Sequence, residues 1–313
     1  MALDIIKIDT KIDINTIEYF KSDFIFFHGE ALDPRGDGAL KIIEQSKISK
    51  SIAFIPDTNQ LMINKDETII FGYELSKYIN SFDVKKVLID STTLSIAEIL
   101  LILHSINQLK DESSSIKILY LEPIEYTGKK SRNNKTHLDY ELSSNLEGYY
   151  NIRPFNLLID TTNPSEKAEV IILLGFEDHR LGRIIKFDEN QKYDSYIPLL
   201  GLPAFQAGWE NITLMKNIRH FNSAFKDIEF VGANNPYQTK AVLEKIYANS
   251  DYDNLLIAAL GTKPCAIGAA VFLVNEYTEK SNNVGVIYDF PKKRKNRTKG
   301  VAKAYIYTLK YSH

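Results

Sequence analysis

The chain has 313 residues, 44% of them hydrophobic and 25% charged, so it is long enough for two domains with packed cores. Its 38 Lys and Arg residues face 40 Asp and Glu residues, which excludes a general nucleic-acid coat protein, because such a protein needs a net cationic surface. The single cysteine, Cys265, excludes a disulfide framework and a cysteine-built zinc site and favours a reducing compartment.

The start of the chain and its apolar runs indicate where the protein resides. Residues 1–9 carry acids where a signal peptide has a cationic start. The runs 99–103 and 266–274 are shorter than the roughly 18–20 apolar residues needed to cross a bilayer. We therefore expect a cytoplasmic protein with no membrane partner.

The first half of the chain alternates apolar runs with helical patterns. The run 24–29 ends in a glycine and predicts a buried strand, and residues 39–43 after it have helical spacing. Runs at 87–90 and 118–122 predict two further strands, joined by an apolar helix over 96–106. Continuous apolar runs are typical of parallel strands that helices cover on both faces. This half therefore predicts a Rossmann-like α/β sheet.

The second half repeats this series in the same order. Apolar runs at 170–175, 256–261 and 286–290 match the three strands predicted in the first half, and the first of them also ends in a glycine. Helical patterns at 181–185 and 267–274 match the two helices.

We interpret the ordered matches as an internal duplication. A further match joins the segment 75–81 with the segment 243–250. The predicted fold class is α/β, with two tandem Rossmann-like parallel-sheet halves at residues 1–150 and 151–313.

The most informative loop follows the strand predicted at 256–260. Ligands of open parallel sheets bind beyond the carboxyl ends of the strands, where loops pass into helices. This loop reads Gly261-Thr262-Lys263-Pro264. Gly261 allows close backbone approach, Thr262 suits a helix cap, and the helix N-terminus with the Lys263 ammonium attracts a phosphate. The alternative is a well-capped turn with an exposed lysine.

A second candidate loop opens at Gly175. It carries Glu177, Asp178 and Arg180, with His179 between the last two. These residue types suit acid–base chemistry or the binding of ribose hydroxyls. The alternative is a solvated loop with a local Asp–Arg pair.

In the first half the counterpart of the Gly-Thr-Lys loop is Asp90-Ser91-Thr92. Ser91 and Thr92 keep hydroxyls for a ligand, and Ser91 is expected to correspond to Thr262. The segment predicts a helix cap with an acidic edge. Because Asp90 would repel a phosphate, we expect the two halves to be unequal as binding sites.

Each half also has a basic loop after its last predicted strand. The basic residues are Lys129 and Lys130 in the first half and Lys292, Lys293 and Arg294 in the second. Their recurrence at matching positions predicts binding of a polyanion such as a nucleic-acid backbone. The alternative is a solubilising surface.

Common motifs of other chemistries are missing from the sequence. It has no Walker A P-loop and no G-x-G-x-x-G after a strand, and its six histidines lack metal-ligand spacing. We therefore expect no metal ion and no cofactor.

The segment 256–270, a buried strand that ends in Gly-Thr-Lys-Pro before a small-residue helix, resembles the CRISPR-associated Rossmann fold (CARF) family. In that family a Gly-Thr-Lys motif cradles a ligand phosphate, the domains dimerise, and cyclic oligoadenylates bind across the two-fold axis. The resemblance implies that two fused halves form an intramolecular version of that dimer, within an antiphage defence system. Asp90-Ser91-Thr92 departs from the motif, which argues against a symmetric ligand.

Together these features predict a ligand-sensing or scaffold subunit that binds a nucleotide or other phosphorylated anion and acts through an effector protein partner. One alternative is a subunit of a nucleic-acid-processing defence complex without a small ligand. The other is an enzyme acting on nucleotides or phospho-sugars, which is less favoured because the sequence shows no nucleophile–base pair or metal set at fixed spacing.

Overall fold

The computed structural model of the chain divides into two compact units. Unit 1 comprises Met1–Glu147 and Phe290–His313, and unit 2 comprises Gly148–Asp289. The structure describes residues 2–17, 20, 23–48, 50–55, 62–65, 68–70, 74–81, 85–109, 111–130, 138–146, 148, 152–157, 159, 166–188, 193–277 and 283–312. Within these ranges no helix is long and apolar enough to cross a membrane.

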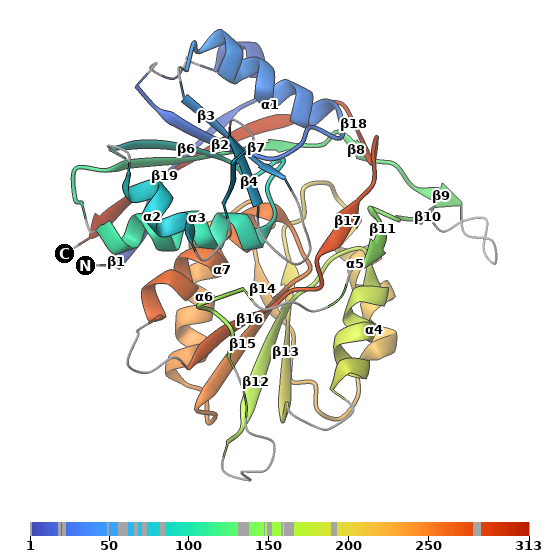
Figure 1. Cartoon of the computed structure of the whole chain (residues 1–313). Helices are drawn as coiled ribbons and strands as arrows, with labels where there is room; N and C mark the ends of the chain where they lie inside the picture. Colours follow the sequence, from blue (N-terminus) through green and yellow to red (C-terminus); the bar gives the residue numbers. More distant parts are fainter. Residues whose placement is uncertain are drawn as a thin grey trace. The chain divides into compact units, whose positions relative to one another are not determined.

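Unit 1 is built on an eight-stranded mixed sheet with the order β1-β19-β7-β6-β2-β3-β4-β5 (Figure 1). The strands are β1 (Ala2–Lys11), β2 (Ile25–His28), β3 (Lys50–Ile55), β4 (Met62–Lys65), β5 (Thr68–Ile70), β6 (Lys86–Asp90), β7 (Ser115–Glu122) and β19 (Lys303–Ser312). Strands β7, β6, β2 and β3 run parallel, and antiparallel strands extend the sheet on both sides.

Helices cover both faces of this sheet, α1 on one face and α2 and α3 on the other (Figure 1). Their bounds are α1 (Pro34–Gln45), α2 (Leu75–Asn80) and α3 (Ile96–Leu109), and a 3-10 helix, η1, spans Ile14–Thr16. Helix α1 begins where the sequence supplies two start signals. The Asp33 carboxylate accepts hydrogen bonds from the N–H groups of Arg35 and Gly36, and Pro34 occupies the first helical position.

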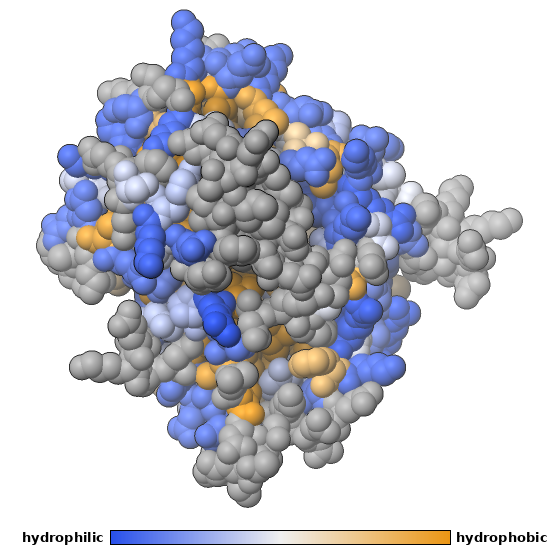
Figure 2. Space-filling model, in the orientation of Figure 1, coloured by the Kyte–Doolittle hydropathy of each residue, from blue (hydrophilic) through white to orange (hydrophobic). Residues whose placement is uncertain are grey.

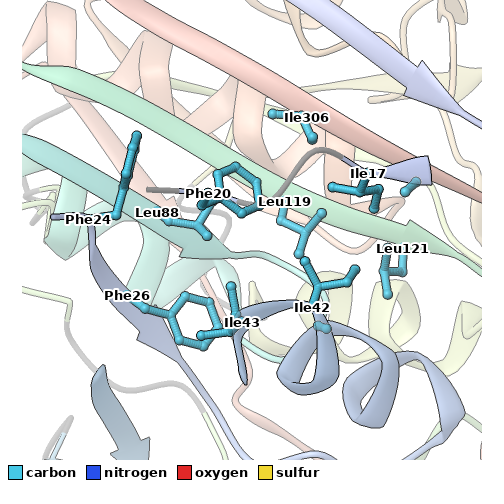
Figure 3. Close-up of a cluster of buried hydrophobic side chains, with 12 residues drawn as sticks. Ile17, Phe20, Phe24, Phe26, Ile42, Ile43, Leu88, Leu119, Leu121 and Ile306 are labelled. Atoms are coloured by element: carbon cyan, nitrogen blue, oxygen red, sulfur yellow. The ribbon is translucent and has the colours of Figure 1, made fainter. Parts of the chain in front are cut away.

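The inner face of α1 closes a hydrophobic core of unit 1. Figure 3 shows Ile42 and Ile43 of α1 directed toward strand residues that include Leu88 and Leu119. Burying a side chain of this size stabilises the fold by about 1.5–3 kcal/mol.

Three two-stranded ribbons lie outside the main sheet of unit 1. They pair β8 (Glu125–Tyr126) with β18 (Thr298–Lys299), β9 (Lys129–Lys130) with β10 (Leu138–Asp139), and β11 (Ser143–Leu146) with β17 (Pro291–Lys293). Two of them join the segment after residue 290 to the segment 125–146, so the returning chain is paired with unit 1 before it reaches β19.

Unit 2 holds a five-stranded sheet in which all neighbouring strands are parallel, in the order β14-β13-β12-β15-β16 (Figure 1). The strands are β12 (Ala168–Leu173), β13 (Ser195–Gly201), β14 (Glu229–Val231), β15 (Asn254–Ala259) and β16 (Val284–Ile287). Every residue of the central strand β12 is buried, as a continuous apolar run predicts for a strand covered on both faces.

The helices of unit 2 also cover both faces of its sheet, α4 and α5 on one and α6 and α7 on the other (Figure 1). Their bounds are α4 (Asp178–Phe187), α5 (Trp209–Asn217), the 3-10 helix η3 (Ile218–His220), α6 (Pro236–Ala248) and α7 (Lys263–Glu276). Helix α7 is buried from Pro264 to Val274, as is typical of a helix that is apolar all round. It packs closely on α6 at Gly268, where a Cβ would lie 2.3 Å from the Pro236 carbonyl oxygen.

Some large hydrophobic residues are exposed, such as Ile12 (81% exposed) and Met215 (61%). On the face shown in Figure 2, hydrophilic residues prevail among the coloured atoms, with hydrophobic ones interspersed among them. Much of the surface of a folded protein is apolar, so exposed residues of this kind are normal.

Both units confirm the predicted α/β fold class with parallel strands. The division of the chain differs from the expected one, because residues 290–313 belong to unit 1 rather than to the second half. Strand β19 lies between β1 and β7 and pairs with both in antiparallel register. An apolar run indicates a strand but not its partners, so the sequence could not show this return.

The parallel strands have the same order in the two units. Unit 1 has β3-β2-β6-β7 and unit 2 has β13-β12-β15-β16, so each strand of one series has a counterpart of the same rank in the other. The duplication remains a prediction, and this shared order supports it.

Candidate ligand site

The strand order of unit 2 reverses between β12 and β15. The chain leaves β12 toward β13 on one side and leaves β15 toward β16 on the other. Open parallel sheets bind ligands at such a reversal, beyond the carboxyl ends of the two strands. The loops after β12 and β15 therefore define the candidate site.

Two glycines line the reversal and bring the strand exits into backbone contact. A Cβ at Gly175 would lie 2.0 Å from the Leu260 carbonyl oxygen, and a Cβ at Gly261 would lie 2.8 Å from that of Leu174. Only glycine fits at these distances. The structure thus brings together the two loops that the sequence selected separately.

Thr262 begins helix α7 and ties two loops together. Its hydroxyl donates to the Ala233 carbonyl at 2.6 Å and accepts the Cys265 N–H at 3.5 Å. The predicted cap is therefore present, but both hydrogen bonds of the hydroxyl are made within the protein, one to helix α7 and one to the loop after β14. Lys263 and Pro264 form the first turn of α7. The positive pole of this helix and the Lys263 ammonium are thus the cationic features at the end of β15.

The acidic loop after β12 is held by residues from η3. Asp178 is buried in the first turn of α4 and accepts hydrogen bonds from Arg219 Nε at 2.9 Å and from His220 Nε2 at 2.8 Å. Burial raises the pKa of the Asp178 carboxyl, but the hydrogen bonds from His220 and Arg219 outweigh burial and hold that pKa below its ordinary value. Asp178 is therefore a carboxylate with partners in its own unit. Glu177 occupies the N-cap position of α4 and is buried.

Arg180 pairs with a residue that sequence spacing does not suggest. Its Nε and Nη2 donate to the Asp289 carboxylate at 2.8 and 2.5 Å, and both side chains are buried. Burial lowers the pKa of the guanidinium, but Asp289 raises it above the ordinary value, so the group stays charged. The pair links the start of α4 to the end of β16. The alternative interpretation, a local Asp–Arg pair, does not hold, since Arg180 pairs with Asp289 and not with Asp178.

Asn217 is a buried residue near the site that the sequence analysis missed. Its amide nitrogen donates to the carbonyl oxygens of Gly175 and Thr213, each at 2.8 Å, and its Oδ1 has no hydrogen-bond partner. Nearby, Phe176 packs edge-on against Trp209 with ring centroids 5.5 Å apart. No pattern in the sequence marks Asn217, because its partner lies 42 residues away.

In unit 1 the hydroxyls of Ser91 and Thr92 are buried and bonded to β7. Ser91 donates to the Leu119 carbonyl at 2.9 Å, and Thr92 accepts the Leu121 N–H at 3.0 Å. Helix α3 begins at Ile96, so the predicted cap at residues 90–92 is wrong. The two hydroxyls connect the ends of β6 and β7.

The two basic loops both lie in unit 1 and not in separate halves. Lys292 is exposed, but Lys293 donates to the Thr93 carbonyl, and Arg294 pairs with Glu141 at 2.9 Å. Lys129 and Lys130 form β9, and their side chains lie outside the described part of the structure. These pairings reduce the charge that Lys293 and Arg294 offer to a polyanion.

The part of the chain that the structure describes contains no group of three or more His, Cys, Asp or Glu side chains placed to hold a metal ion. Comparison with protein families and with curated proteins gives no match to this chain.

Proposed function

We propose that unit 2 binds a nucleotide or another phosphorylated anion at the carboxyl ends of β12 and β15, and that the chain is a ligand-sensing or scaffold subunit. One observation carries the proposal: Gly175 and Gly261 bring the two strand exits into contact where the strand order reverses, and α7 begins there with Thr262 and Lys263. Backbone N–H groups at such a helix start attract phosphate.

The charges around the reversal favour α7 over α4 as the anion-binding helix. Helix α4 starts with Glu177 and Asp178, whose negative charge opposes a phosphate. Helix α7 has no acid in its first turn and carries Lys263 at its first position. A phosphate at α7 would leave the ring pair formed by Phe176 of the neighbouring loop and Trp209 of α5 for an apolar or aromatic part of the ligand.

The alternatives remain predictions with less support from the geometry. The enzyme would use Glu177, Asp178 and His179, but Asp178 is held by Arg219 and His220. The nucleic-acid-processing subunit would use the basic loops, in which Lys293 and Arg294 have partners in unit 1. A role in antiphage defence with an effector partner is what the CARF resemblance would add to the favoured proposal.

A binding experiment with one charge removed tests the proposal. Isothermal titration of the full chain would use a panel of linear and cyclic nucleotides and inorganic phosphate. We expect Lys263→Ala to weaken binding of the phosphorylated ligands by about 1.5–3 kcal/mol, the range for a hydrogen bond to a charged group.

Lys245→Ala is the matched control, because Lys245 is an exposed lysine in the last turn of α6. It should leave the affinity unchanged. Equal binding by Lys263→Ala and the wild-type chain would remove Lys263 from the site, and no binding to any member of the panel would overturn the proposal.

A further inference from the structure

The chain passes from unit 2 to unit 1 between two charged side chains that are only four positions apart. Asp289 is the last residue of unit 2, and Phe290 is the first residue of the returning part of unit 1. The Asp289 side chain, 1% exposed, is gripped by the Arg180 guanidinium of α4 in a two-point ion pair. The chain thus leaves unit 2 from a fixed point beside the candidate ligand site.

The second fixed point is Lys293 in unit 1. Its ammonium donates to the Thr93 carbonyl in the turn after β6, and the carboxylates of Glu98 and Asp90 lie close enough to stabilise its charge. Burial and the neighbouring Arg297 and Arg35 oppose them, so that the pKa of Lys293 falls to about 8.

The three residues between the fixed points have little conformational freedom. Phe290 has φ of +43°, a left-handed backbone that is strained for a bulky side chain. Pro291 has a ring-restricted φ, and residues 291–293 form β17, which pairs with β11 (Figure 1). The first crossing between the units has Gly148 at φ of +123°, a conformation that glycine adopts without strain.

We propose that residues 289–293 form a coupling strap, through which a change at the Arg180–Asp289 pair of unit 2 alters the seating of Lys293 on the turn after β6 in unit 1. A short, strained segment that is held at both ends transmits displacement. A movement of Asp289 changes the force on Lys293, and a movement of Lys293 changes the force on Asp289. The coupling does not depend on the proposed ligand site, although it would give a sensing module a path to its other unit.

Further contacts would carry the effect into unit 1. Beyond Lys293, the Arg294 N–H donates to the Leu142 carbonyl and the Asn296 N–H donates to the Leu32 carbonyl at 2.7 Å. Leu32 lies in the loop between β2 and α1, next to the buried Asp33–Arg35 pair. Release of the strap would therefore expose two amide groups, one bonded to the segment before β11 and one bonded to the loop after β2.

Hydrogen exchange of the full chain without ligand tests the coupling. Asp289→Asn removes the negative charge that holds the Arg180 guanidinium. Because this weakens one anchor of the strap, we expect the amides of Arg294 and Asn296 to exchange about fivefold faster or more. The matched control, Glu244→Gln, breaks the ion pair between Glu244 and Lys240 on α6 and should leave those two amides unchanged.

The reciprocal variant separates coupling from local fraying. Lys293→Met should speed exchange of the first α4 amides that have intrahelical partners, because coupling between two sites is reciprocal. Arg180→Lys is the fallback if Asp289→Asn fails to fold, since it keeps the charge and loses the two-point grip. Unchanged exchange at Arg294 and Asn296 in a folded Asp289 or Arg180 variant, or at α4 in Lys293→Met, would overturn the strap and leave the proposed anion site untouched.

Discussion

Two buried ion pairs, one in each unit, join loops at the carboxyl ends of strands. In unit 2 Arg180 holds Asp289, and in unit 1 Arg35 holds Asp33 at 3.0 Å, with all four side chains buried. Removing one partner of a buried pair leaves an uncompensated charge at a cost of about 3–5 kcal/mol. The main role of these four residues is therefore to fix the geometry of the loops they join.

The stability of unit 1 should depend on pH through Asp33. Burial raises the pKa of this carboxyl, but Arg35 and Arg297 outweigh burial and lower it from 3.8 to about 2. A depressed carboxyl pKa contributes stability that is complete above the unfolded value and is lost as the pH falls through the folded value. We expect Asp33 to contribute about 2 kcal/mol to the free energy of unfolding of unit 1 at pH 6, most of it lost by pH 2.

Asp33→Asn isolates this effect, because asparagine keeps a capping oxygen for α1 and removes the charge. Hydrogen exchange of the α1 amides, measured from pH 6 to pH 2 after correction for intrinsic rates, should show a less stable variant at pH 6 and a shallower decline below pH 4. Parallel curves for the variant and the wild-type chain would contradict the assignment to Asp33.

At the scale of elements, apolar runs predicted the parallel strands, but the lengths of the turns after them were not predictable. Phe27 and Leu173 each lie two residues before the matching glycine of their unit, and they pair with Ile89 and Ala259. Ile89 therefore corresponds to Ala259. Counting three residues on from each aligns Thr92, rather than Ser91, with Thr262. Helix α3 starts only at Ile96, and Thr93 in the turn before it accepts a hydrogen bond from the Gly29 N–H at 2.8 Å. A long-range bond of this kind leaves no local pattern in the sequence.

At the candidate site, too, some residues could be predicted from the sequence and others could not. Gly175 and Gly261 were predictable because a tight strand exit restricts the residue type. Asn217 and Asp289 were not, because their roles come from partners 42 and 109 residues away. Residue types required by backbone geometry can be read locally, whereas partners brought together by packing cannot.

The packing of α7 on α6 gives a test at this scale. Alanine usually stabilises a helix interior relative to glycine by about 1 kcal/mol. At Gly268, however, a Cβ would lie 2.3 Å from the Pro236 carbonyl oxygen and 2.8 Å from Thr239 Cβ, and such overpacking costs about 1–3 kcal/mol. We expect Gly268→Ala to lower the thermal unfolding temperature by roughly 2–8 °C.

Gly38→Ala in α1 is the matched control. A Cβ there would lie 3.2 Å from Leu121 Cδ1, the end of a side chain that can yield, so the change should be neutral or stabilising. If both variants behave alike in a thermal melt, the close approach of α6 and α7 is not what restricts position 268.

The whole molecule is one contiguous unit inserted into a discontinuous one. Unit 2 is complete between Gly148 and Asp289, whereas unit 1 needs residues 290–313 to supply β19. The boundary of the predicted duplication therefore does not coincide with that of the folded units, because β19 completes the sheet of unit 1. Two crossings join the units, and only the second contains the coupling strap.

This arrangement predicts unequal outcomes for fragments. The fragment 148–289 contains its whole sheet and four covering helices and should unfold cooperatively on its own.

A chain ending at Asp289 lacks β19, which leaves β1 without its strand partner and turns β7 into an edge. Unit 1 should therefore lose protection against hydrogen exchange while unit 2 keeps it. Joining 1–147 to 290–313 through a short Gly/Ser linker restores β19 and should restore protection of β7 amides in hydrogen exchange. Protected β7 amides in the chain ending at Asp289 would show that unit 1 folds without β19, because edge pairing alone would then hold the sheet.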